Sequence, residues 1–302
     1  MATRCGAPSP GCGLTLHPFH YDTAPLNTAS VPWASAWVFT KRQMTMTLKP
    51  TVGQRYRKRH PDNPHLRLWF YLIYHGMQVQ TSRGPLIENY LYTLLRVMNQ
   101  ARRANSRTYA IRIDLRFPEA MLVSSLLVSN AAISQFFTNL CWELNLINLK
   151  YPHDMRYVWA REQKNSDKPH YHVLLLFNGN ALQSLGPLSP YADKSATEAY
   201  AADTLYHRIV RAWEGVVGWP AEQMGGLVNV SRDKLTKELL TFHFHHDDQT
   251  TFEELFYAAS YLCKAHTKPI AQGVHCCEGS RRQSPPLSGA AAGPASQGLL
   301  GE

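Results

Sequence analysis

The run HYHVLLLFN at residues 170–178 constrains the fold more than any other part of the sequence. It is largely apolar and ends at the turn signal Asn178-Gly179, so it predicts a central strand of a sheet. The segment YAIRIDLRFP alternates between apolar and charged side chains up to Pro118, which is typical of a half-buried strand. The chain therefore has at least two strands that need a partner layer to cover their apolar faces.

Six further segments are expected to be regular. Two of the helices should begin at capping boxes, in which Ser195 precedes Glu198 and Thr251 precedes Glu254. The order of strands and helices predicts an α+β fold with a central antiparallel sheet flanked by helices. The remaining segments are expected to be helices over residues 85–103, 130–149, 195–215 and 251–265 and strands over residues 156–162 and 226–230.

Composition divides the chain into regions. The first 43 residues are rich in Pro, Ser, Thr, Ala and Gly and lack periodicity, so no structure is expected there. We hypothesise that translation starts at Met44 or Met46, which N-terminal sequencing of the native protein would test. The expected regions are an unpatterned extension at 1–43, a basic flanking segment at 44–84, a folded domain at 85–277 and a disordered tail at 278–302.

The positive charge is concentrated in one stretch. The chain has a net charge of +9, and residues 41–120 alone hold 15 basic residues against 4 acidic ones. Such a concentration indicates a polyanionic partner, nucleic acid first, although a well-solvated basic surface is the alternative. The candidate residues for contacts to DNA phosphates are Arg55, Arg57, Lys58, Arg59, Arg102 and Arg103.

Several classes of protein are excluded or disfavoured. No run of about 18 apolar residues exists, so we expect no membrane-spanning helix and no membrane partner. The apolar patch at residues 31–39 follows no basic segment, which argues against a secretory signal. The six cysteines form no CxxC pair, which gives no support to a zinc ribbon or a thioredoxin-like motif. Cys141 and Cys263 lie in apolar helical patterns, as small core residues do, which favours a reducing compartment, hence the cytoplasm.

The first motif with chemistry is His170-Tyr171-His172. Residues two apart in a strand point to the same face, so both imidazoles should aim at one divalent cation. A carboxylate from the neighbouring strand, that of Glu162, would complete a set of three ligands. The pattern alone is weak, since His243 and His245 form a second pair of this kind, and the alternative is a pair of strand histidines bonded to their neighbours.

The second motif is FYAASYLCKAHTK on the last expected helix. Tyr257 and Tyr261 are four residues apart and should share one helix face with Lys264. A phenol is a poor nucleophile, but a phosphate polarised by a metal and a nearby cation would make attack by a phenolate feasible. The alternative is an aromatic helix face packed on the sheet, with Lys264 reaching to solvent.

Taken together, these motifs resemble a known family. The segments GPLIENYL, YAIRIDLRFP, RYVWARE, KPHYHVLLLFNG and FYAASYLCKAHTKP are similar to the YagK/YfjJ C-terminal domain family, over roughly residues 80–277. That family includes replication-initiator-like proteins of inoviruses and related prophages. The order of strand, His-x-His strand and tyrosine helix also resembles the HUH endonucleases, which initiate rolling-circle replication.

The resemblance implies an HUH-type core with a C-terminal tyrosine-bearing helix. It implies that His170, His172 and Glu162 bind Mg²⁺ or Mn²⁺. Tyr261 would cut one strand of single-stranded or origin DNA, leaving a 5′-phosphotyrosine and a free 3′-OH, and Lys264 would position the phosphate.

Two points stay open in this resemblance. Tyr257 is expected to be either a second nucleophile or a packing residue. The rival function is a catalytically inactive prophage DNA-binding regulator on the same fold, and host replication proteins are further expected partners.

Overall fold

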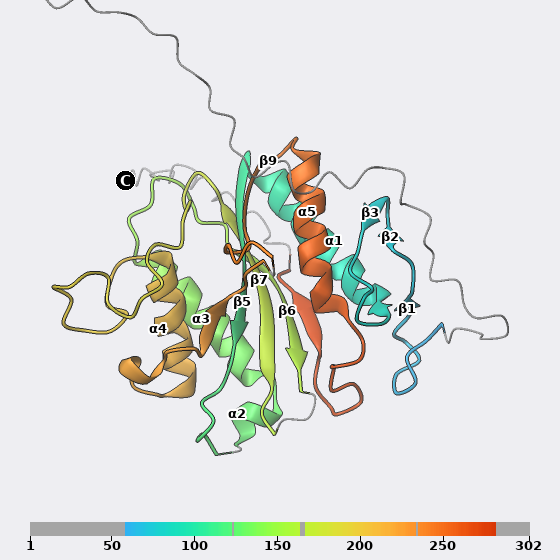
Figure 1. The fold of residues 1–302 in the computed structure, drawn as a ribbon, viewed down its shortest axis with the longest axis horizontal. Coiled ribbons are helices and arrows are strands. Elements are labelled where there is room, and N and C mark those ends of the chain that lie inside the picture. Colours follow the sequence, from blue (N-terminus) through green and yellow to red (C-terminus); the bar gives the residue numbers. More distant parts are fainter. Residues whose placement is uncertain (1–57, 123, 164–166, 234, 282–302) are drawn as a thin grey trace, which may run out of the picture. The chain divides into compact units, whose positions relative to one another are not determined.

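A computed structural model describes residues 58–122, 124–163, 167–233 and 235–281. Its centre is a six-stranded sheet in which every pair of neighbouring strands is antiparallel, in the order β10-β6-β7-β5-β8, with β9 also pairing with β5 (Figure 1). The predicted α+β class and antiparallel sheet are therefore confirmed. The strands are β5 (Arg107–Leu115), β6 (Arg156–Glu162), β7 (His170–Asn178), β8 (Val228–Val230), β9 (Thr241–His245) and β10 (Cys277–Gly279).

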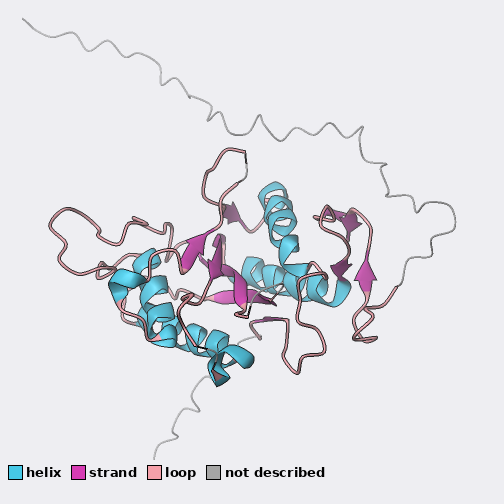
Figure 2. Ribbon diagram, turned by 60° about the horizontal axis from the view of Figure 1, so that its bottom comes forward, coloured by secondary structure: helices cyan, strands magenta, loops and turns pink. Residues whose placement is uncertain are grey.

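Helices cover both faces of this sheet. Helices α3 and α4 lie on one face and α1 and α5 on the other, and Figure 2 shows the same layering from another direction. Each pair of helices closes its own apolar cluster against the sheet. The helices are α1 (Glu88–Ala104), α2 (Ser125–Val128), α3 (Ala131–Asn145), α4 (Leu205–Val217) and α5 (Gln249–Ser260), with short 3-10 turns η3 (Ala221–Gln223) and η4 (Tyr261–Cys263).

The central strand alternates as its sequence predicts. Tyr171 and Val173 are buried in the cluster under α3 and α4, whereas Leu174 and Leu176 are buried in the cluster under α1 and α5. The same alternation turns His172 toward the α1 and α5 face, because it shares the parity of Leu174. The alternation of side chains along β7 thus decides which pair of helices the two histidines face.

Two small strand pairs precede the main domain. β1 (Leu68–Trp69) pairs with β4 (Leu86–Ile87), and β2 (Ile73–Tyr74) pairs with β3 (Met77–Gln78). Tyr74 and Met77 are buried in the cluster under α1 and α5. The residues before position 85, which the sequence assigned to a flanking segment, therefore belong in part to the core of the domain.

The fourth expected helix begins later than the sequence predicts. α4 starts at Leu205, and the Thr204 hydroxyl accepts the cap bond from the backbone N–H of His207. The prediction of a capping box at Ser195 is wrong, because the backbone N–H and the hydroxyl of Ser195 both donate to the carboxylate of Asp193. A local turn of this kind satisfies Ser195 without a helix.

The last helix differs at both ends. Asp248, not Thr251, caps α5, because its carboxylate accepts from the backbone N–H of Thr251 at 3.0 Å, and Glu254 is exposed. The helix ends at Ser260, tightens into η4 and reaches an extended backbone at Lys264, so the expected end near residue 265 is wrong. A bridge between Leu86 and Lys264 pulls the chain out of the helix.

The carboxyl-terminal edge of the domain is β10. It pairs with β6 from Cys277 to Gly279, so the sheet extends past the boundary expected at residue 277. A side chain at Gly279 would collide with Val97 of α1, which explains why the edge strand has a glycine there. The expected extension at 1–43, together with Arg55 and Arg57, and most of the expected tail, residues 282–302, lie outside the described residues.

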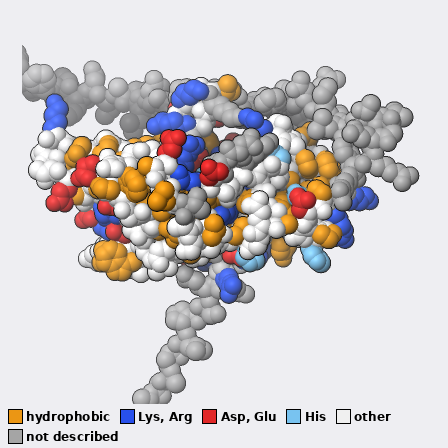
Figure 3. Space-filling model, turned by 90° about the horizontal axis from the view of Figure 1, so that it is seen from below, with side chains coloured by type: hydrophobic (Ala, Val, Ile, Leu, Met, Phe, Trp, Pro, Cys, Tyr) orange, Lys and Arg blue, Asp and Glu red, His pale blue; other side chains and the backbone are white. Residues whose placement is uncertain are grey.

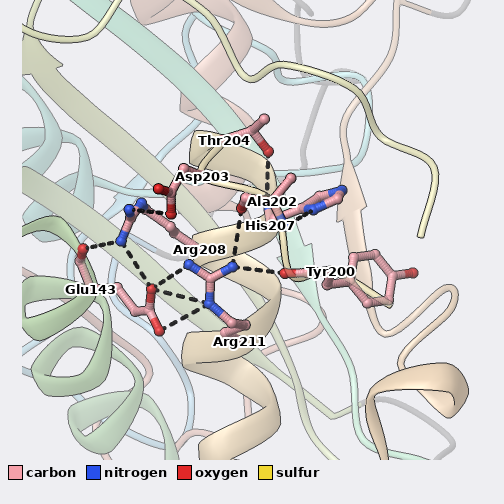
Figure 4. A network of polar contacts seen from close by, with 8 residues as sticks. All are labelled: Glu143, Tyr200, Ala202, Asp203, Thr204, His207, Arg208 and Arg211. Carbon is pink, nitrogen blue, oxygen red and sulfur yellow. Dashed lines mark hydrogen bonds and ion pairs between the residues drawn. The ribbon is translucent and has the colours of Figure 1, made fainter. Parts of the chain in front are cut away.

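A buried polar network joins α3 and α4 (Figure 4). The carboxylate of Glu143 on α3 accepts from the guanidinium groups of both Arg208 and Arg211 on α4, at distances down to 2.7 Å. Arg211 also donates to the carbonyl oxygens of Tyr200 and Ala202. The network therefore fastens the long connection before α4 to the helical layer.

Two properties of the described chain bear on its surroundings. Its four described cysteines, Cys141, Cys263, Cys276 and Cys277, are free thiols. Among the residues that the structure describes, no helix combines the length and the apolar character that a membrane span requires.

Candidate metal and tyrosine site

The site forms where three neighbouring strands place polar side chains on the α1 and α5 face. In the register of the sheet, Asp114 of β5 is opposite His172 of β7, and His170 of β7 is opposite Glu162 of β6. Further along the same face the strands carry apolar residues, among them Leu174. The polar patch is therefore confined to one end of an otherwise apolar surface.

Asp114 fixes the orientation of His172. The two side chains hydrogen bond at 2.5 Å between Asp114 Oδ1 and His172 Nδ1. Burial alone would raise the pKa of Asp114, but the hydrogen bond and charge of His172 outweigh it and lower the pKa below its usual value. Asp114 is therefore an ionised acceptor, which directs the other ring nitrogen, Nε2, toward Glu162.

Glu162 is the centre of the cluster. Its Oε2 lies 3.3 Å from His172 Nε2 and 3.7 Å from His170 Nε2. The same oxygen pairs with Lys264 Nζ at 2.8 Å, and Oε1 pairs with Lys268 Nζ at 2.9 Å. Burial would raise the pKa of Glu162, but His172, Lys268 and Lys264 together hold it well below its usual range. The carboxylate is therefore ionised at any physiological pH.

His170 forms the open side of the cluster. Its side chain is 33% exposed, against 8% for His172 and 2% for Glu162. Burial, assisted by the neighbouring His172, lowers the pKa of His170 to about 4. At neutral pH this imidazole is therefore uncharged, which is the form that binds a metal ion.

The residues fit a divalent cation. One ligand atom from each of Glu162, His170 and His172 lies within 4.8 Å of the others. His172 Nε2 is buried and, despite its closeness to Glu162, makes no hydrogen bond to any described residue. A buried polar atom without a partner is costly, so a ligand at this nitrogen would remove a penalty. Two imidazoles and a carboxylate form a set that suits Mn²⁺ better than Mg²⁺, which prefers oxygen ligands.

Tyr261 lies directly over this cluster. Its hydroxyl oxygen accepts a hydrogen bond from Lys264 Nζ at 2.5 Å, and its ring centroid is 5.5 Å from that of His172. The Arg112 guanidinium of β5 lies 4.9 Å from the centre of the same ring. The strand histidines and the tyrosine, which are about 90 residues apart in the sequence, therefore share one face of the sheet.

Neighbouring side chains hold the end of α5 in place. Arg112 donates to the carbonyl oxygen of Ala258, and the Gln80 amide donates to the carbonyl oxygen of Tyr257 at 3.0 Å. The Ser260 hydroxyl also donates to the Tyr257 carbonyl and accepts from the backbone N–H of Gln80. Because these side chains satisfy the last carbonyl groups of the helix, the chain can leave it at Tyr261.

The sequence placed Lys264 on the same helix face as the tyrosines, and this is wrong. Lys264 lies beyond the helix, and its side chain reaches back to Tyr261 and Glu162. Tyr257 is in the last turns of α5 and its side chain is half-buried. Among the residues that the structure describes, the hydrogen bonds of Tyr257 within the site are made by its backbone carbonyl oxygen and not by its side chain.

The candidate DNA-contacting residues divide into two groups. Arg102 is half-buried and has partners on α5, because its guanidinium donates to Gln249 at 2.8 Å and stacks 4.3 Å from the centre of the Phe252 ring. Lys58, Arg59 and Arg103 are exposed. On the face in Figure 3, Lys and Arg side chains lie among acidic and apolar ones and do not form one continuous basic surface.

The second histidine cluster lies on a different element. His245, His246 and Asp247, at the end of β9, could also share a metal ion, but most of this group is exposed. His245 pairs with Asp247 at 2.5 Å, while His243 stacks on Tyr109. Two of these histidines therefore already have side-chain partners within the described residues.

Sequence reasoning missed three residues of the site. Asp114 and Arg112 were assigned only to the charged side of a half-buried strand, although a charged residue opposite a histidine strand is a usable signal. Lys268 was missed because it follows the helix in an unpatterned stretch, and its side chain is fully buried against Glu162.

Two comparisons with known proteins give matches. One curated relative, Uncharacterized protein YfjJ of Escherichia coli (strain K12), is 31% identical over 119 residues, which are 39% of this chain and 51% of the relative. The match thus spans about half the length of that relative. No solved structure matches significantly. The family model of the YagK/YfjJ C-terminal domain matches residues 72–279, more than half of the chain, so the chain belongs to the YagK/YfjJ C-terminal domain family.

Proposed function

We propose that this protein is a metal-dependent endonuclease of the HUH type that nicks and rejoins single-stranded DNA, as a rolling-circle replication initiator does. One observation carries the proposal. The hydroxyl of Tyr261, the ammonium of Lys264 and Oε2 of Glu162 form a continuous chain of contacts of 2.5 and 2.8 Å. The same oxygen faces the ring nitrogens of both histidines.

The residues divide the chemistry between them. The Tyr261 oxygen would attack the phosphorus of a phosphodiester, and the bond from phosphorus to the 3′ oxygen would break. The products are a 5′-phosphotyrosine and a free 3′-OH, and rejoining is the reverse reaction. Lys264 and Arg112 would hold the phosphate and the phenolate by their charge. A divalent cation held by His170, His172 and Glu162 would supply Lewis-acid polarisation of the phosphate when bound.

The test is the covalent adduct. Purified protein is mixed with Mn²⁺ and single-stranded DNA from the regions flanking its gene, and the products are separated on a denaturing gel. We expect an adduct with the unaltered protein and none with Tyr261→Phe or His172→Ala. Tyr257→Phe is the matched control and should retain the adduct. An adduct that persists in Tyr261→Phe and disappears in Tyr257→Phe would assign the reaction to the other tyrosine.

A second function has an observation in its favour. Both oxygens of Glu162 already pair with lysines, so the charge of this carboxylate is compensated without a metal ion. This favours a DNA-binding regulator that has kept the fold and lost catalysis. Such a protein would bind the same DNA in a mobility-shift assay and would form no adduct under any metal condition.

A further inference from the structure

The two oxygens of Glu162 have different surroundings. Oε1 pairs with Lys268, whose side chain is fully buried. Oε2 pairs with Lys264 and is also the oxygen that lies 3.3 and 3.7 Å from the ring nitrogens of His172 and His170. The oxygen that a cation shared with the histidines would use is therefore the one that Lys264 holds.

An ammonium and a metal ion cannot both bind this oxygen closely. The charge of +1 on the ammonium and the charge of +2 on the metal ion would repel each other strongly at contact distance in a partly buried site. We infer that Lys264 is an internal competitor of the divalent cation, and that the two alternate at Oε2 of Glu162. This inference rests on the proposed function, because it takes the same three residues as the metal ligands.

Lys264 has a second position available. Its ammonium is 2.5 Å from the Tyr261 hydroxyl and 3.7 Å from the centre of the Tyr261 ring, so a small movement away from Glu162 leaves it beside the nucleophile. A phosphodiester at Tyr261 would offer it a new anionic partner. Lys268 has no comparable alternative among the contacts of the described residues, and it would stay on Oε1.

The charges of the cluster indicate that binding of DNA and binding of the metal ion strengthen each other. Arg112, Lys264 and Lys268 are cationic, and only Glu162 and Asp114 are anionic, which leaves one net positive charge. A divalent cation alone enters against this charge, whereas a phosphodiester compensates for part of it. Binding free energies are reciprocal, so DNA should strengthen metal binding by the same factor by which metal strengthens DNA binding.

The experiment measures Mn²⁺ affinity from the loss of the free-ion EPR signal. All proteins carry Tyr261→Phe to prevent cleavage, with and without a single-stranded oligonucleotide. In this background we expect the oligonucleotide to tighten Mn²⁺ binding about tenfold. Adding Lys264→Met should tighten Mn²⁺ binding by a similar factor in the absence of DNA. The oligonucleotide should then increase the Mn²⁺ affinity of this variant little further. Lys264→Gln repeats the measurement if Lys264→Met does not fold.

Lys268→Met is the matched control, because it removes the same charge from the other oxygen of the same carboxylate. If Lys264→Met binds Mn²⁺ no more tightly than Lys268→Met, charge removal explains the effect and the competition is refuted. Absence of Mn²⁺ binding in every variant would also overturn it. The adduct assay is independent of these results. If the unaltered protein forms the adduct but Lys264→Met leaves the Mn²⁺ affinity unchanged, only the inference is refuted. If the Mn²⁺ affinities are as expected but the unaltered protein forms no adduct, only the nicking reaction is refuted.

Discussion

His172 shows how one hydrogen bond can prepare a strand histidine for a ligand. Asp114 holds Nδ1 at 2.5 Å and leaves Nε2 buried and without a hydrogen bond to a described residue. Carboxylates that orient a histidine in this way raise the basicity of the ring and fix its tautomer. The contribution of Asp114 therefore acts through His172 and needs no contact with the metal.

Replacing Asp114 by Asn should weaken Mn²⁺ binding by about tenfold or more, because partners of ligating histidines contribute at this level. Isothermal titration calorimetry of the unaltered protein and of Asp114→Asn measures the change in Mn²⁺ affinity. Asp247→Asn is the matched control, since Asp247 makes a bond of the same length to His245 at the end of β9. Weaker Mn²⁺ binding in Asp247→Asn, with Asp114→Asn unchanged, would place the metal at the exposed histidine group instead.

At the scale of elements, the sequence predicted what periodicity encodes. β6 and β7 have the bounds that their patterns indicate, and α1 and α3 end within a few residues of expectation. The two wrong helix starts fall where a local side chain satisfies the backbone, as Asp193 does at Ser195. Such competition depends on side-chain rotamers, which a residue pattern does not contain.

The candidate site was predictable in part, because the alternation of side chains along a strand determines which of them share a face. His170, His172 and Glu162 follow from strand parity and register, because neighbouring strands of one sheet bring them together. Lys264 and Lys268 could not be placed, because their positions depend on where α5 ends. That end is set by Arg112 and by Gln80 from the loop before α1, contacts of long sequence separation.

Glu143 offers a test of how α3 and α4 are joined. Replacing it by Ala should lower the free energy of unfolding by about 3 kcal/mol, because Arg211 loses its carboxylate and the buried Arg208 keeps only that of the exposed Asp203. Urea denaturation measures this value, and Glu254→Ala, at an exposed position on α5, should change it by less than about 0.5 kcal/mol. Equal stability of the two variants would mean that the carbonyl bonds of Arg208 and Arg211 suffice.

On the scale of the whole molecule, several cations of the basic stretch, among those that the structure describes, already have partners within the protein. Arg112 is drawn into the site, Arg67 pairs with Glu88 at 2.9 Å, and Arg102 is fixed on α5. A cation that already has an internal partner gains less from a phosphate than a free one. The charge excess therefore overstates the number of side chains available to DNA.

The salt dependence of DNA binding separates these groups of cations. For single strands, the logarithm of affinity falls with the logarithm of salt concentration by about 0.7 for each phosphate neutralised. Replacing the exposed Lys58 and Arg103 together by Gln should reduce this slope by about 1.4 in fluorescence anisotropy with a labelled oligonucleotide. Arg102→Gln should leave the slope unchanged and lower the melting temperature, because it loses Gln249 and the Phe252 ring. A reduced slope in Arg102→Gln alone would mean that DNA displaces these internal contacts and that the strand crosses the N-terminal end of α5.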